Sequence, residues 1–210
     1  MFGFMRKKNS PRSLTQEQIK ELTRVLIIDD EEPRELRALL RKEGWKTTHL
    51  TDLDSLANKS LNEAHIVCID IMGVGKILQV SDGLELVGHI KERYPNKKVI
   101  LYSSVSRQDI FSDSLDYVDK RLRKEASLVP FVTAIEEMAA NTFSWDEALV
   151  YAYEKMGKNL VEIVSFDQFR QLAEKSITSS GFDSKRFSKK AGSSLDVAAK
   201  LATLLSLAVG

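Results

Sequence analysis

The sequence has only one cysteine, Cys68, so an internal disulfide bond is impossible. The apolar residues around it in Val67-Cys68-Ile69 predict a buried thiol in a reducing compartment. An excess of charge of one sign is also missing, because 31 Lys and Arg residues are balanced by 30 Asp and Glu residues and the net charge is +1. Bulk electrostatics therefore give no drive towards nucleic acid or acidic lipid.

Long hydrophobic runs are missing as well. The longest apolar stretch, residues 195–209, is interrupted by Asp196 and Lys200 and is shorter than the ~20 residues of a membrane span. The first eight residues place apolar side chains before basic ones and are too short for a secretory signal. We expect a cytoplasmic protein.

A nucleotide-binding loop is suggested by Gly73-Val74-Gly75-Lys76 but lacks its defining residues. A Walker loop needs an earlier glycine at a fixed spacing and a Ser or Thr after the lysine, and here Ile77 follows. The three histidines, His49, His65 and His89, do not have metal-ligand spacing. The sequence thus argues against a nucleotide site and a histidine metal site.

Short apolar runs alternate with amphipathic stretches from residue 24 to residue 140, which is the pattern of a parallel sheet covered by helices. We predict strands at residues 25–28, 46–50, 66–69, 98–102 and 117–118. Helical spacing of apolar residues predicts helices at 33–42, 83–93 and 129–138, with weaker ones at 53–58 and 106–111.

The chain is predicted to have three parts. A polar and basic arm, residues 1–23, precedes the α/β domain, residues 24–140. Strand signals stop beyond residue 140, where Ser144 and Ser165 each begin a capping-box pattern. Residues 141–210 are therefore predicted to form a small all-α module.

Polar side chains follow the ends of four predicted strands. Asp29 and Asp30 follow the first strand, and Asp70 follows the third. Ser103 follows the fourth strand, and Lys120 comes after the fifth. Because the carboxyl ends of parallel strands meet at one edge, we expect these side chains to lie together.

This set of residue types points to phosphoryl chemistry. Clustered carboxylates are tolerated mainly around a divalent cation, and oxygen ligands with room for water favour Mg²⁺. A carboxylate is a known phosphoryl nucleophile, and a lysine and a hydroxyl can bind the phosphate. The pattern predicts a site that makes and holds an aspartyl phosphate.

Five separated motifs resemble the receiver domain of two-component response regulators, in the order V-L-I-I-D-D-E, V-C-I-D-I-M, D-G-L-E-L-V, V-I-L-Y-S-S and D-Y-V-D-K. The resemblance implies a flavodoxin-like, doubly wound five-stranded parallel sheet of order 2-1-3-4-5. It also implies phosphorylation by a histidine kinase, a phosphotransfer protein or a small phosphodonor. Such a protein is a phosphoaccepting signalling protein that catalyses only its own phosphorylation and dephosphorylation.

The resemblance also implies roles for single residues. Asp70 takes the place of the phosphoacceptor, and Mg²⁺ would be bound by Asp30, Asp70 and the backbone carbonyl of Met72. Asp29 would act on the metal mainly through water.

Three further residues occupy the places of the family's switch. Ser103 takes the place of the hydroxyl switch residue, Lys120 that of the phosphate-pairing lysine, and Tyr117 that of the switching aromatic. Phosphorylation would then change the surface made by the fourth helix, fifth strand and fifth helix.

Two departures from the family pattern are visible. Val74 stands where the family usually has a proline, and Asp82-Gly83 arrives late, so residues 73–81 form a loop about five residues longer. Arg121, not the usual proline, follows Lys120.

The output of the C-terminal module has several possible forms. Its apolar residues Leu195, Ala198, Ala199, Ala202 and Leu205 form a seam narrow enough for close helix contact, so we favour protein contacts or self-association. The alternatives are DNA binding through the basic residues 185–190 and a scaffold that never accepts phosphate.

Overall fold

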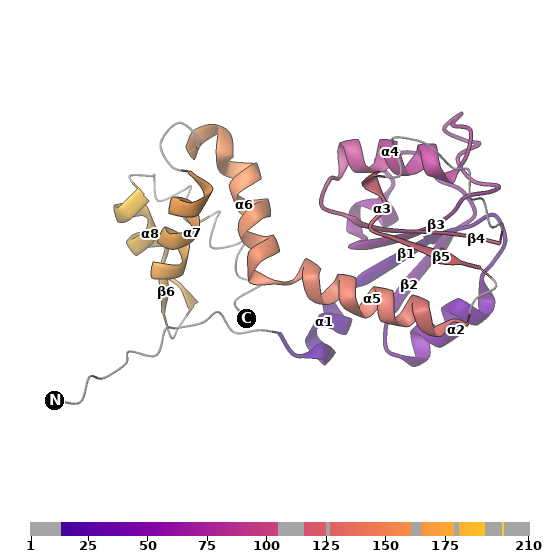
Figure 1. Cartoon of the computed structure of the whole chain (residues 1–210), viewed down its shortest axis with the longest axis horizontal. Coiled ribbons are helices and arrows are strands. Elements are labelled where there is room, and N and C mark those ends of the chain that lie inside the picture. The colour runs from indigo at the N-terminus through magenta and orange to yellow at the C-terminus, as the bar shows by residue number, and fades with distance from the viewer. Residues whose placement is uncertain are drawn as a thin grey trace. The chain divides into compact units, whose positions relative to one another are not determined.

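A computed structural model of the chain describes residues 14–104, 116–124, 127–160, 165–178, 181–191 and 199 (Figure 1). The chain divides into two compact units, residues 16–142 and residues 143–210 together with residues 1–15. The helix predicted at 106–111 lies outside the described residues, as does the C-terminal seam apart from Ala199. Within the described part of the chain, no helix is both long enough and apolar enough to cross a membrane.

The first unit is built on a parallel sheet of five strands in the order β2-β1-β3-β4-β5, which confirms the predicted fold class. The strands are β1 (Arg24–Ile28), β2 (Lys46–Leu50), β3 (Ile66–Asp70), β4 (Lys98–Ser103) and β5 (Lys120–Arg123). In the register, Ile69 lies opposite Ile28 of β1, and Asp70 lies opposite Tyr102 of β4. The carboxyl ends of the three central strands therefore lie side by side.

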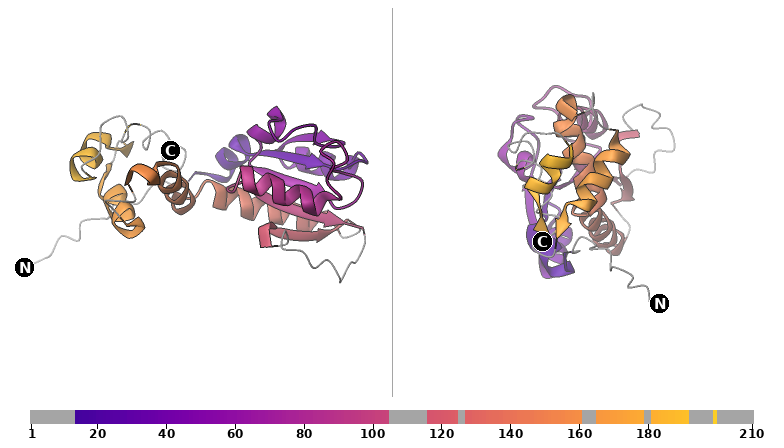
Figure 2. Two further views of the ribbon diagram at one scale, coloured as in Figure 1. Left: turned by 90° about the horizontal axis from the view of Figure 1, so that it is seen from above. Right: turned by 90° about the vertical axis from the view of Figure 1, so that its left-hand side faces the viewer.

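Helices cover both faces of the sheet (Figures 1 and 2). One face carries α3 (Lys59–Glu63) and α4 (Gly83–Arg93), and the other carries α1 (Gln16–Leu22), α2 (Arg34–Lys42) and α5 (Val129–Thr142). Each face has its own apolar cluster, and β3 is fully buried between them. Burial on both faces explains why β1, β3 and β4 are mostly continuous apolar runs without polar alternation.

The start of α4 is fitted closely to the end of β3. Asp82 caps the helix by accepting hydrogen bonds from the backbone N–H groups of Leu84 and Glu85. Gly83 lies so close to β3 that a Cβ atom would overlap the backbone carbonyl oxygen of Asp70. Its missing side chain allows the helix to begin beside the end of this strand.

Two element predictions in this unit are wrong. Residues 53–58 do not form a helix, because Asn58 instead caps α3 with its side chain and the helix begins at Lys59. The fifth strand is not at residues 117–118 but at 120–123, where only Leu122 is half-buried and the other three residues are exposed basic side chains. Such a polar sequence is typical of an edge strand, where solvent covers much of the surface.

The second unit contains three described helices, α6 (Trp145–Leu160), α7 (Phe166–Lys175) and α8 (Ser184–Ala191). The capping box predicted at Ser165 is present, with reciprocal bonds between Ser165 and Gln168. The core joins Leu149 and Ala152 of α6 to Phe169 of α7 and Phe187 of α8. Between α7 and α8 the chain also forms two short antiparallel strands, β6 (Ile177–Thr178) and β7 (Gly181–Phe182), which the sequence analysis did not predict.

Candidate functional site

Three aspartates meet at the carboxyl edge of the sheet. Asp29 and Asp30 directly follow β1 and Asp70 ends β3, and one carboxylate oxygen from each lies within 4.8 Å of the others. Asp29 and Asp70 are buried, whereas the Asp30 side chain is 42% exposed. A set of oxygen donors with one side open to water fits a hard divalent cation such as Mg²⁺, which keeps part of its water shell.

Lys124, the residue that directly follows β5, is the cation of this site. Its Nζ lies 2.7 Å from a carboxylate oxygen of Asp70 and 3.2 Å from both carboxylate oxygens of Asp29. Its backbone N–H donates to the carbonyl oxygen of Ser103 at 2.9 Å, which ties the end of β5 to the end of β4. One ammonium group therefore bridges two buried carboxylates.

The pKa values of the bridged groups reflect burial and mutual charge. Burial raises the pKa of Asp70, and the charge of Asp29 adds to this rise, while the hydrogen bond and charge of Lys124 and the backbone N–H of Met72 oppose it. Burial lowers the pKa of Lys124, but its hydrogen bonds to Asp70 and Asp29 outweigh this effect, so that the net shift is upward. Lys124 therefore remains a cation at neutral pH.

Lys120 does not reach the aspartates, so its assignment as the phosphate-pairing lysine is wrong. It begins β5, opposite Ile100, at the far end of the strand from the carboxylates. Its Nζ lies 3.8 Å from a carboxylate oxygen of Glu137 on the surface. The basic run K-R-L-R-K contains two lysines four residues apart. Because the fifth strand was predicted too early, at residues 117–118, the prediction assigned the site to Lys120 and not to Lys124.

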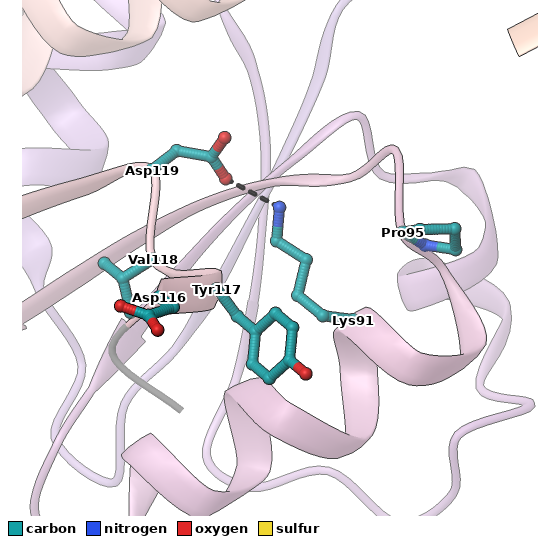
Figure 3. A pocket seen from close by; sticks show the side chains of 6 residues that line it. All are labelled: Lys91, Pro95, Asp116, Tyr117, Val118 and Asp119. Atoms are coloured by element: carbon teal, nitrogen blue, oxygen red, sulfur yellow. Dashed lines mark hydrogen bonds and ion pairs between the residues drawn. The ribbon is translucent and has the colours of Figure 1, made fainter. Parts of the chain in front are cut away.

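The predicted switch role of Tyr117 came from the motif D-Y-V-D-K, which ends in Lys120 and not in the lysine that contacts Asp70. The role therefore stays a prediction. Tyr117 precedes β5, is 49% exposed, and lines a pocket of about 180 Å³ beside Lys91 of α4 (Figure 3). In that pocket Lys91 pairs with Asp119 at 2.8 Å.

The remaining predicted residues lie at the site, and their roles stay predictions. Ser103 is buried at the end of β4. Met72 donates its backbone N–H to Asp70, and its side chain is exposed. The residue after Lys124 is Glu125, not the family's proline, and it lies outside the described residues.

The long loop of residues 73–81 is folded against the site. Gly73 has φ +82°, and a Cβ atom there would overlap the carboxylate of Asp30. Val74 is buried in the core on the α4 side, and Lys76 places its Nζ 4.0 Å from Asp30. The loop therefore adds a second, more exposed cation to the acidic cluster.

Asp52 holds this loop in place. Its carboxylate accepts the backbone N–H of Gly75 at 2.6 Å and that of Ile77 at 3.0 Å, on either side of Lys76. We expect Asp52→Asn to lose about 1–2 kcal/mol of unfolding free energy, since an amide has one acceptor oxygen where the carboxylate has two. Hydrogen exchange at the Gly75 and Ile77 amides should become faster.

The matched control for this prediction is Asp54→Asn, because the exposed Asp54 carboxylate accepts a hydrogen bond from the Asn58 side chain and lies outside the loop contacts. This variant should keep the exchange rates of the loop amides. Equal protection of Gly75 and Ile77 in both variants would show that Asp52 does not fix the loop.

Comparisons with known proteins bear on the first unit. No protein-family model matches the sequence, and no curated protein matches it. A solved structure of a two-component system response regulator/GGDEF domain protein is 17% identical, with a TM-score of 0.50, over 60% of this chain and 53% of that chain. The receiver domain of a Francisella response regulator is 19% identical, with a TM-score of 0.45, over 57% of this chain and 98% of that one.

A third solved structure, the receiver domain of NtrX from Brucella abortus, is 23% identical, with a TM-score of 0.47, over 55% of this chain and 97% of that chain. Because these identities are low, the comparisons support the fold but do not show the chemistry. Residues 16–142 have the fold of response regulator receiver domains.

Proposed function

We propose that residues 16–142 are a receiver domain of a two-component response regulator and that Asp70 accepts a phosphoryl group. The observation that carries the proposal is the bridge from Lys124 to Asp70 and Asp29 beside the exposed carboxylate of Asp30. Phosphoryl transfer needs a nucleophile, here Asp70, a positive charge beside it, here the Lys124 ammonium, and an open acidic face that can hold a metal ion.

The chemistry follows from these positions. A carboxylate oxygen of Asp70 forms a bond to the phosphorus of the donor, while the bond to the leaving group breaks and the leaving group keeps the electron pair. Lys124 neutralises charge on the phosphoryl oxygens, since its ammonium already lies against Asp70. In the separate dephosphorylation step a water oxygen bonds to phosphorus while the bond from phosphorus to the Asp70 oxygen breaks, and inorganic phosphate and the Asp70 carboxylate are released.

Mg²⁺ is the metal that this donor set would hold. Asp30 and Asp70 would bind it, with the Met72 carbonyl as the third protein ligand that the family resemblance implies. Asp29 already accepts hydrogen bonds on both of its oxygens and would contact the metal through water. When bound, the ion would supply positive charge against the transferring phosphoryl oxygens.

The proposal is tested by incubating the purified chain with Mg²⁺ and acetyl phosphate and measuring its intact mass. The wild type should gain one phosphoryl group, and Asp70→Asn should gain none, because the amide is not a nucleophile for phosphorus. Asp54→Asn, which changes an exposed aspartate, should behave like the wild type. No adduct on the wild type, or an equal adduct on Asp70→Asn, would contradict the proposal.

The phosphodonor in the cell would be a histidine kinase or a phosphotransfer protein. Phosphorylation would alter the binding of partner proteins to the receiver unit and the C-terminal unit. One observation favours DNA binding by the C-terminal unit as the second candidate. On α8, Phe187 and Ala191 are buried, while four basic side chains are exposed: Lys185, Arg186, Lys189 and Lys190. Retention on DNA that weakens with salt would distinguish this output from protein contacts.

A further inference from the structure

A buried tyrosine that the chemistry above does not use touches the acidic cluster. Tyr102 of β4 donates its hydroxyl hydrogen to a carboxylate oxygen of Asp29 at 2.7 Å, and the two residues are 1% and 0% exposed. Asp70 lies between them on the intervening strand, opposite Tyr102 in the register. The tyrosine side chain thus reaches across β3 to the end of β1.

The Asp29 carboxylate is held by donors from three parts of the chain. The backbone N–H of Glu31 and the ammonium of Lys124 contact one oxygen, and Tyr102 and the same ammonium contact the other. Burial and the neighbouring Asp29 charge raise the pKa of Tyr102, so the phenol keeps the proton that it donates. The tyrosine therefore shares the negative charge of Asp29 with Lys124.

This sharing matters because Asp29 and Asp70 compete for one ammonium group. Lys124 lies closer to Asp70, at 2.7 Å, than to Asp29, at 3.2 Å. Without the tyrosine hydroxyl, Lys124 would be the remaining donor to one oxygen of a fully buried carboxylate among the described residues. The attraction of Asp29 for Lys124 would increase, and the lysine would be less available to Asp70.

We propose that Tyr102 is a positioning residue of the phosphoryl site, whose hydrogen bond to Asp29 leaves Lys124 free to bind the phosphoryl group on Asp70. The inference rests on the proposed phosphoryl chemistry and adds a residue that acts through Asp29 and Lys124. Tyr102 takes no part in bond making or breaking.

The ring of Tyr102 is held independently of its hydroxyl, so the hydroxyl can be removed alone. The ring packs edge-on against Phe131 of α5, with centroids 5.4 Å apart, and both rings line a cavity of about 310 Å³ together with Leu36 and Leu128. Tyr102→Phe should therefore keep the ring in place.

The test compares Tyr102→Phe with the wild type in the full-length chain. We expect about tenfold weaker binding of the phosphoryl analogue beryllofluoride, and a similarly shorter lifetime of the phosphorylated form, since a hydrogen bond to a charged group is lost. Affinity for Mg²⁺, measured by calorimetry, should not fall, because the Tyr102 hydroxyl bonds to Asp29 and the proposed metal ligands Asp30 and Asp70 keep their positions. A general loss of structure would lower both affinities together.

Tyr94→Phe is the matched control, because the half-buried Tyr94 hydroxyl donates to the backbone carbonyl of Leu56 at 2.7 Å and the residue belongs to the α4 side of the sheet. It should leave beryllofluoride and Mg²⁺ affinity unchanged. In an Asp29→Asn background, Tyr102→Phe should have little further effect on beryllofluoride binding, because the charge that the hydroxyl shares is gone.

The outcomes separate the two proposals. If the wild type binds beryllofluoride and Mg²⁺ but Tyr102→Phe matches it, the role of Tyr102 is overturned and the phosphoryl site stands. If Tyr102→Phe loses affinity equally with and without the Asp29 carboxylate, the tyrosine does not act through Asp29 and the inference also fails. If the wild type binds neither Mg²⁺ nor beryllofluoride and takes no phosphoryl group, the proposed function itself is wrong.

Discussion

Lys124→Met is expected to reduce phosphorylation of Asp70 at least tenfold and to lower the unfolding free energy by about 2–4 kcal/mol without a divalent cation. The substitution removes the ammonium that bridges Asp29 and Asp70, and both carboxylates are buried. Two buried negative charges would then repel each other without compensation. Mg²⁺ should restore part of the stability, because it supplies positive charge to the same cluster.

Lys120→Met is the control for this prediction, since it removes the same charge from the other end of the same strand. Lys120 and Glu137 lie on the surface, with side chains 48% and 60% exposed, so their ion pair should be worth about 0–1 kcal/mol. Intact mass after acetyl phosphate treatment and urea unfolding with and without Mg²⁺ measure both effects. If Lys120→Met lost phosphorylation and Lys124→Met kept it, the site lysine would be Lys120 and not Lys124.

The central sheet was predictable from the sequence because its strands are buried on both faces. The continuous apolar runs of β1, β3 and β4 can be satisfied only between two layers of helices, and their ends were located to within one residue. The three aspartates follow directly from those ends. Their meeting required nothing beyond parallel strands in the observed order.

The site lysine was not predictable in the same way, because it follows an edge strand. β5 has one half-buried residue, Leu122, in a run of exposed basic side chains, so hydrophobic pattern carries little information there. Alternation along a strand places Lys120, Leu122 and Lys124 on one face, so it cannot distinguish the two lysines. The pairing of Ser103 with Arg123 does distinguish them, because it puts the residue after Arg123, Lys124, at the carboxyl end of the sheet beside the aspartates.

The contact between Tyr102 and Asp29 has no local signal at all. It joins Tyr102 of β4 to a residue 73 positions earlier that directly follows β1, and β3 lies between these two strands. Sequence spacing predicts which face Tyr102 occupies but not that its hydroxyl reaches the cluster. The fold of loop 73–81 was equally hidden, because it depends on Asp52 from a distant connection.

Gly73→Ala is expected to weaken Mg²⁺ binding about tenfold or more, because the added Cβ atom would overlap the carboxylate of Asp30. Asp30 would have to rotate away from the cluster, and the loop would carry a left-handed backbone on a residue with a side chain. Backbone strain alone costs about 1 kcal/mol and would not change metal affinity. A loss of Mg²⁺ affinity in Gly73→Ala would therefore show that the metal depends on the position of the Asp30 carboxylate.

Gly44→Ala separates these two effects. Gly44 has φ +91°, close to the +82° of Gly73, but its added Cβ atom would meet only the flexible Lys20 side chain at 3.9 Å. Both variants should lose similar stability from backbone strain in urea unfolding, while calorimetry should show weaker Mg²⁺ binding in Gly73→Ala alone. Equal Mg²⁺ affinity in the two variants would mean that Asp30 does not bind the metal in the position described, and that the metal depends on Asp70 and its neighbours instead.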